Sequence, residues 1–77
     1  MEIFEKINTA TNTVEITMFG FTAEIKQGLS FNQTTQRYQT KYSVLFERQV
    51  IALSQAELEK YLMFIDYVHY RLQEMNA

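Results

Sequence analysis

The only histidine of this chain has an acidic partner at helical spacing. Asp66 precedes His69 by three residues, and residues three apart on a helix lie on the same side, so the carboxylate can orient the imidazole. Two such pairs from two subunits can hold a metal ion in a helical bundle. A single aspartate–histidine pair, in a chain without cysteine, is weak support for a metal site. We therefore expect His69 to cap the edge of the core, and we predict no metal and no cofactor.

The sequence also lacks the short motifs that mark many catalytic sites. It contains no glycine-rich phosphate loop and no nucleophile elbow. The absence of cysteine excludes a thiol nucleophile, a thiolate metal site and a disulfide framework. These observations predict a protein that is not an enzyme and has no catalytic residues.

A basic and aromatic segment, residues 37–48, raises the alternative of single-stranded nucleic-acid binding. Its candidate phosphate contacts are Arg37, Lys41 and Arg48. Single-strand platforms stack bases on aromatic rings that share a face with the cations. Successive side chains of a strand point to opposite faces, so Tyr38 and Tyr42 are expected to lie opposite Arg37 and Lys41. With a net charge of −2, nucleic-acid binding is the alternative and not the preferred function.

A long helix must carry His69, and its start is marked in the sequence. Ser54 and Glu57 have capping-box spacing, in which the serine hydroxyl accepts from one unpaired backbone N–H and the glutamate accepts from another. The segment from Ser54 predicts a helix of about 21 residues, roughly 31 Å long. Such a helix is long enough to cross a small sheet.

This predicted helix has two apolar stripes when residues are placed about 100° apart. The larger stripe, expected to face the sheet, consists of Leu58, Tyr61, Leu62, Phe64, Ile65, Val68, Leu72 and Met75. Met63, Tyr67 and Tyr70 fall on the opposite face, and Glu74 borders them. Scattered exposed apolar residues are normal, but tyrosine and methionine are enriched in interface cores with polar rims. These four residues are therefore the predicted protein interface.

Two alternating segments precede the helix. The apolar residues Val14, Ile16 and Met18 stand at even positions. After Phe19-Gly20 the apolar residues stand at odd positions. A tight hairpin would explain the change by setting Met18 opposite Phe21, Ile16 opposite Ala23 and Val14 opposite Ile25. A single long strand with a bulge at Gly20 would explain it equally well.

The remaining strands are less sharply marked. Residues 3–7 fit an edge strand or one helical turn, and we predict a strand. Gly28 is expected to end the strand before it, and residues 32–36 read as a loop. A further strand is predicted within 37–48, and residues 49–53 read as its continuation or as a short fourth strand.

The length and composition fit one domain, residues 1–77. A chain this short buries only about 60% of its unfolded surface, so a homodimer is the expected source of added stability. The N-terminus has no signal-peptide pattern, and the apolar runs are too short to span a membrane, which predicts a cytoplasmic protein.

The sequence therefore predicts an α+β fold with an antiparallel sheet of three or four strands and one long C-terminal helix packed on one face. A composition free of cysteine and proline and rich in Asn, Gln and Thr is typical of small accessory proteins of bacteria and their phages. Many of these bind and block another protein. We expect a non-enzymatic protein-binding module whose partner is itself, another protein, or both.

Overall fold

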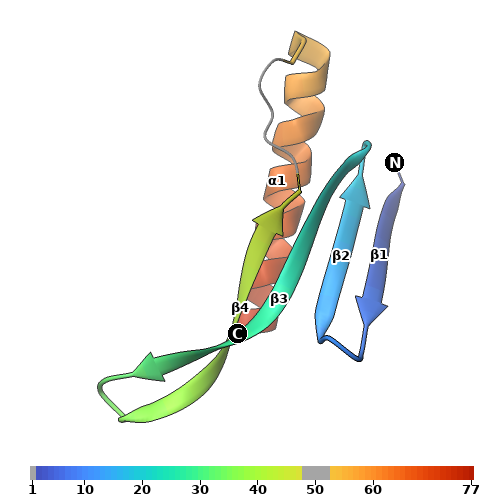
Figure 1. The fold of residues 1–77 in the computed structure, drawn as a ribbon. Coiled ribbons are helices and arrows are strands. Elements are labelled where there is room, and N and C mark those ends of the chain that lie inside the picture. The colour runs from blue at the N-terminus through green and yellow to red at the C-terminus, as the bar shows by residue number, and fades with distance from the viewer. Residues whose placement is uncertain (1, 48–52) are drawn as a thin grey trace.

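In a computed structural model of the chain, which describes residues 2–47 and 53–77, four antiparallel strands form a sheet and one long helix lies against it (Figure 1). The strands pair in the order of the sequence, so the sheet is a meander. The elements are β1 (Ile3–Asn8), β2 (Thr13–Met18), β3 (Phe21–Asn32), β4 (Arg37–Phe46) and α1 (Gln55–Asn76). The predicted α+β fold is confirmed.

A tight hairpin joins β2 to β3, as one of the two sequence interpretations predicted. Met18 lies opposite Phe21, and the pairing continues without a bulge to Thr13 and Lys26. Phe19 and Gly20 both have positive φ, 55° and 81°, which is the backbone of the hairpin turns whose twist matches that of the strands. The bulge is therefore excluded at Gly20.

The other two strand connections share one local design. Asn8 accepts hydrogen bonds at its side-chain oxygen from the backbone N–H groups of Ala10 and Thr11, and Asn32 does the same for Thr34 and Thr35. An asparagine side chain at this position closes a turn by imitating a backbone carbonyl. The predicted loop at residues 32–36 is confirmed for residues 33–36, whereas Asn32 is the last residue of β3.

β3 is longer than predicted, because Gly28 does not end it. Gly28 is paired with Lys41 inside a continuous β3–β4 ladder that runs to Asn32 and Arg37. The strand prediction for the first residues is confirmed by β1, whereas the suggested continuation after β4 falls almost wholly on residues 48–52, outside the described residues.

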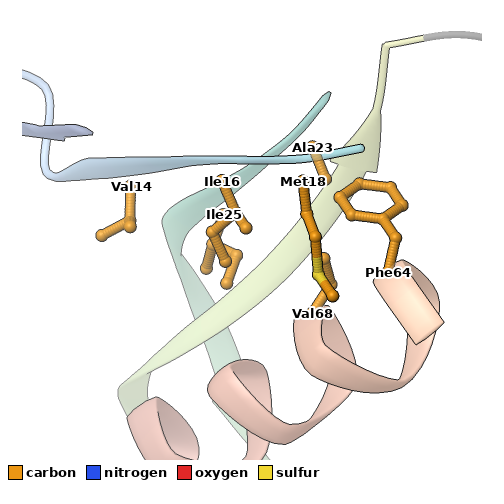
Figure 2. Packing of buried hydrophobic residues seen from close by; sticks show 7 residues of the cluster. All are labelled: Val14, Ile16, Met18, Ala23, Ile25, Phe64 and Val68. Atoms are coloured by element: carbon orange, nitrogen blue, oxygen red, sulfur yellow. The ribbon is translucent and has the colours of Figure 1, made fainter. Parts of the chain in front are cut away.

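The core lies between the sheet and α1 (Figure 2). Its buried side chains are Val14, Ile16 and Met18 from β2, Ala23 and Ile25 from β3, and Phe64 and Val68 from α1. The ring of Phe64 contacts those of Phe21 and Phe46, with centroid separations of 5.7 and 6.0 Å. Alternation in β2 and β3 thus places one apolar face under the helix, as their parity predicts.

The helix is longer than the sheet body that it covers. Its 22 residues span about 33 Å, whereas the six residues of β2 span about 20 Å. Its first turns extend past the ends of β2 and β4 (Figure 1). The predicted capping box is present: Ser54 Oγ accepts from Glu57 N at 3.2 Å, and Glu57 Oε1 accepts from Ser54 N at 3.2 Å.

Replacing Ser54 by alanine is expected to lower the free energy of unfolding by about 1 kcal/mol, because Glu57 N–H loses its acceptor at the helix start. Urea unfolding followed by circular dichroism measures this loss. Ser54→Asp is the matched control, because its carboxylate can accept the same hydrogen bond. Equal stability of Ser54→Ala and the parent would contradict a helix capped at this residue.

Candidate protein-interaction surfaces

The helix faces the sheet with most of the predicted stripe: Phe64 and Val68 are buried, and Tyr61, Leu72 and Met75 pack against the core. Leu58 and Leu62 were assigned to the sheet-facing stripe but are exposed, at 41% and 54% of their surface. Tyr67 was assigned to the outer stripe but is partly buried and packs against the core. At 100° per residue, the centre of the observed sheet-facing side is thus roughly 60° from the centre of the predicted stripe, toward Tyr67.

On the side toward Tyr67, a polar cluster joins α1 to the first strand. Tyr67 donates its hydroxyl to Glu5 Oε1 at 3.1 Å, and Arg71 donates Nε to the same oxygen at 2.7 Å. A second nitrogen of Arg71, Nη1, donates to Glu74 at 3.3 Å. Tyr67 and Glu5 are 62 residues apart in the chain, so no local pattern could have revealed their contact.

The same contacts shift the ionisation of both donors. Partial burial, followed by the hydrogen bond to Glu5, raises the pKa of Tyr67. The hydrogen bond to Glu5 also raises the pKa of Arg71. The raised pKa values favour the protonated forms, which donate to Glu5.

Of the four residues predicted as an interface, three remain on the outside of the helix. Met63 and Tyr70 are exposed, at 47% and 60%, and Glu74 is exposed beside Arg71. Tyr67 is the exception, because it packs against the core.

The sheet has an extension that α1 does not cover. β2 pairs with β3 only as far as Lys26, and the outer parts of β3 and β4 continue as a two-stranded ribbon (Figure 1). We call residues 27–42 the arm. At its base, Asn76 at the end of α1 donates Nδ2 to the Tyr42 carbonyl at 3.0 Å and accepts from Tyr42 N at 2.8 Å. The helix therefore ends where the arm begins.

One face of the arm is apolar and exposed. Leu29, Phe31 and Tyr38 share the parity of the core residues of β3 and β4, and 77%, 50% and 69% of their surfaces are exposed. The rings of Phe31 and Tyr38 contact each other across the two strands, with centroids 5.2 Å apart. Sequence reasoning missed this surface because it ended the strand at Gly28. The alternation of Ile25, Leu29 and Phe31 in one parity was the available signal.

The other face of the arm is polar and basic. Arg37 and Lys41 lie opposite Asn32 and Gly28, in the parity opposite to that of Tyr38 and Tyr42, as predicted. The tyrosine rings and the two cations therefore occupy different faces. Arg48, the third predicted nucleic-acid contact, lies outside the described residues.

His69 is exposed on the helix, and its ring approaches that of Phe46 edge-on with a centroid separation of 6.5 Å. Asp66 is exposed on the same helix. Within residues 2–47 and 53–77, no three His, Cys, Asp or Glu side chains are grouped in a way that could hold a metal ion. In that same part of the chain, α1 is too polar to cross a membrane, and no other helix is present.

Comparison with known proteins adds no relative: no protein-family model matches the chain, and neither does any curated protein or solved structure. The candidate surfaces therefore rest on geometry alone.

Proposed function

We propose that this chain is a small non-enzymatic protein-binding module that acts in the cytoplasm by covering, and so blocking, a surface of another protein. The single observation that carries the proposal is the apolar face of the arm, formed by Leu29, Phe31 and Tyr38. The row of core-facing side chains on β3 and β4 continues onto this face beyond the last turn of α1. In the described residues no side chain lies over it.

Neighbouring exposed apolar side chains favour the interpretation of this face as a protein-binding surface. Folding normally brings large alternating apolar side chains under a second layer, and neighbouring exposed ones mark binding surfaces more often than isolated ones do. The two aromatic rings are of residue types enriched at protein interfaces, and Leu29 adds apolar area beside them. The polar side chains at Gln27 and Thr40 flank Leu29 on the same face, which gives the apolar centre a polar border.

The outer side of α1 offers a second, smaller surface. Met63 and Tyr70 supply apolar contacts, and Glu74 supplies a polar edge. We propose it as an accessory contact, because Met63 and Tyr70 are not joined by a ring contact of the kind that links Phe31 and Tyr38 on the arm.

The alternative, single-stranded nucleic-acid binding, has less support. Arg37 and Lys41 lie on the opposite face of the arm from Tyr38. A nucleic-acid strand stacked on the Tyr38 ring would therefore be on the other face from both cations. Binding through these cations alone would depend strongly on salt concentration.

Panning a random peptide library against the immobilised protein tests the proposal. Peptides with apolar anchors are expected to be selected, and Leu29→Lys with Tyr38→Lys should weaken their binding about tenfold or more, because two cations replace the apolar centre. The matched control is Ser30→Lys with Gln39→Lys, which adds the same charge to a neighbouring pair on the other face. Equal binding to both variants would overturn the proposal. Salt-sensitive binding of a single-stranded oligonucleotide, lost in Arg37→Gln with Lys41→Gln, would replace it with the alternative.

A further inference from the structure

The two edges of the sheet are protected to different degrees. On β4, the side chain of Asn76 occupies both backbone hydrogen-bonding groups of Tyr42 at the outer edge. At the other edge, all six residues of β1 are exposed, including Ile3 and Ile7 on the helix-facing side and Phe4 on the opposite side. Proteins usually cover or shorten such an edge, because its free backbone groups can pair with another strand.

The register fixes which backbone groups of β1 are free. Glu47 N donates to Thr22 O, so even-numbered residues of β3 point to β4 and odd-numbered residues point to β2. Following this alternation through the bulge-free ladders, Phe4, Lys6 and Asn8 bond to β2. The N–H and C=O groups of Ile3, Glu5 and Ile7 therefore point away from the sheet.

We propose that β1 pairs antiparallel with β1 of a second copy of this chain, about a twofold axis at Glu5. This surface is distinct from the arm, so the inference goes beyond the proposed function. In this register Ile3 lies opposite Ile7 of the second copy, and Glu5 lies opposite its counterpart. The three outward residues of each copy then make about six backbone hydrogen bonds across the axis.

The side chains of β1 complement themselves in this register. On the helix-facing side, each Ile3 meets an Ile7, and both are exposed in the single chain. On the opposite side, Phe4 lies across from Lys6 of the second copy, which allows its ammonium group to approach the ring. Sliding the strands by two residues instead pairs Ile7 with Glu5 and sets one Lys6 against the other. An apolar pair, an aromatic–cation pair and the largest number of hydrogen bonds therefore select the same register.

The facing Glu5 carboxylates are the apparent objection to this pairing. Each of them is already paired with an Arg71 guanidinium at 2.7 Å and accepts from Tyr67 at 3.1 Å. The axis therefore brings together two Glu5 carboxylates that each already hold an Arg71 guanidinium, which is shared with Glu74, and not two unpaired negative charges. This arrangement favours a second copy as the partner of β1. A foreign strand would need a side chain of its own that fits opposite Glu5.

Engineered disulfides test the register cleanly, because the chain has no cysteine of its own. Phe4→Cys and Lys6→Cys are made separately and then mixed in a glutathione redox buffer. Directly opposite residues of a non-hydrogen-bonded pair have Cα atoms about 4.5 Å apart, within disulfide range, whereas two Phe4 or two Lys6 positions lie roughly 8 Å apart. The mixed disulfide is therefore expected to exceed clearly the half share that random pairing gives.

The dimer itself is tested on the unmodified protein by sedimentation equilibrium. The parent is expected to show twice the 9.2 kDa chain mass, and Ile7→Pro should shift it to the monomer. Proline removes only an N–H that points away from β2, and its φ suits an edge strand. Ile7→Thr is the matched control and should keep the dimer, because it retains that N–H. Circular dichroism verifies that both variants are folded.

Three results would overturn the inference: a parent that stays monomeric up to roughly 1 mM, a random share of mixed disulfide, or a dimer that Ile7→Pro leaves intact. These results leave the proposed function standing, because peptide binding by the arm is measured on Leu29 and Tyr38 and does not require β1 to pair. Conversely, a β1 dimer that selects no peptides would overturn only the proposed function.

Discussion

Phe64→Ala is expected to lower the free energy of unfolding by about 3–5 kcal/mol, the largest effect of a single substitution that we expect in this chain. Phe64 is 1% exposed and contacts the rings of Phe21 and Phe46 on two strands. Its removal leaves a cavity at the junction of β3, β4 and α1. A domain of 77 residues has a total stability of about 4–12 kcal/mol, so the loss is a large share of it.

Urea unfolding monitored by circular dichroism measures this effect. Leu62→Ala is the matched control, because Leu62 lies two residues away on the same helix and is 54% exposed. Its expected loss is about 0.5 kcal/mol. Similar losses for Phe64→Ala and Leu62→Ala would contradict the side of the helix that faces the sheet.

Tyr67→Glu is expected to destabilise the fold by about 2–3 kcal/mol. The substitution removes an aromatic ring that packs against the core and places a second carboxylate beside Glu5, where Tyr67 now donates a hydrogen bond. The sequence alone places Tyr67 on the outer face of the helix, where such a replacement would leave the core untouched.

Tyr70→Lys is the control for this prediction, since Tyr70 is 60% exposed on the outer side of the same helix. It should change the stability by no more than about 0.5 kcal/mol. Adding Glu5→Gln to Tyr67→Glu should recover part of the loss by removing the like-charge repulsion. Equal losses for Tyr67→Glu and Tyr70→Lys would show that the Glu5 contact contributes nothing.

The features predicted correctly from the sequence are those set by neighbouring residues. The change of apolar parity around Phe19 and Gly20 allowed a hairpin or a bulged strand, and the hairpin is the one observed, in the predicted register. The spacing of Ser54 and Glu57 identified the start of α1, because a capping box is a contact between residues three apart.

The features that were missed depend on distant partners. The apolar stripes of α1 are broad enough to allow several rotations about its axis, and the observed one brings Tyr67 and Arg71 into contact with Glu5, more than sixty residues away in the chain. Gly28 looked like a strand end because glycine weakens isolated strands, yet ten paired positions between β3 and β4 carry the ladder through it. The candidate arm surface was overlooked for the same reason.

The meander also determines the order in which the fold can assemble. Each strand pairs with the one just before it, and among the described residues the most distant hydrogen bonds, Tyr67 and Arg71 to Glu5, belong to α1. Closing short loops costs little entropy, so hairpins can form within about 1–10 μs, ahead of long-range contacts. During synthesis the strands leave the ribosome before α1 does. For that interval the apolar face of β2 and β3 has no Phe64 to cover it, and the nascent chain exposes its own core to other proteins.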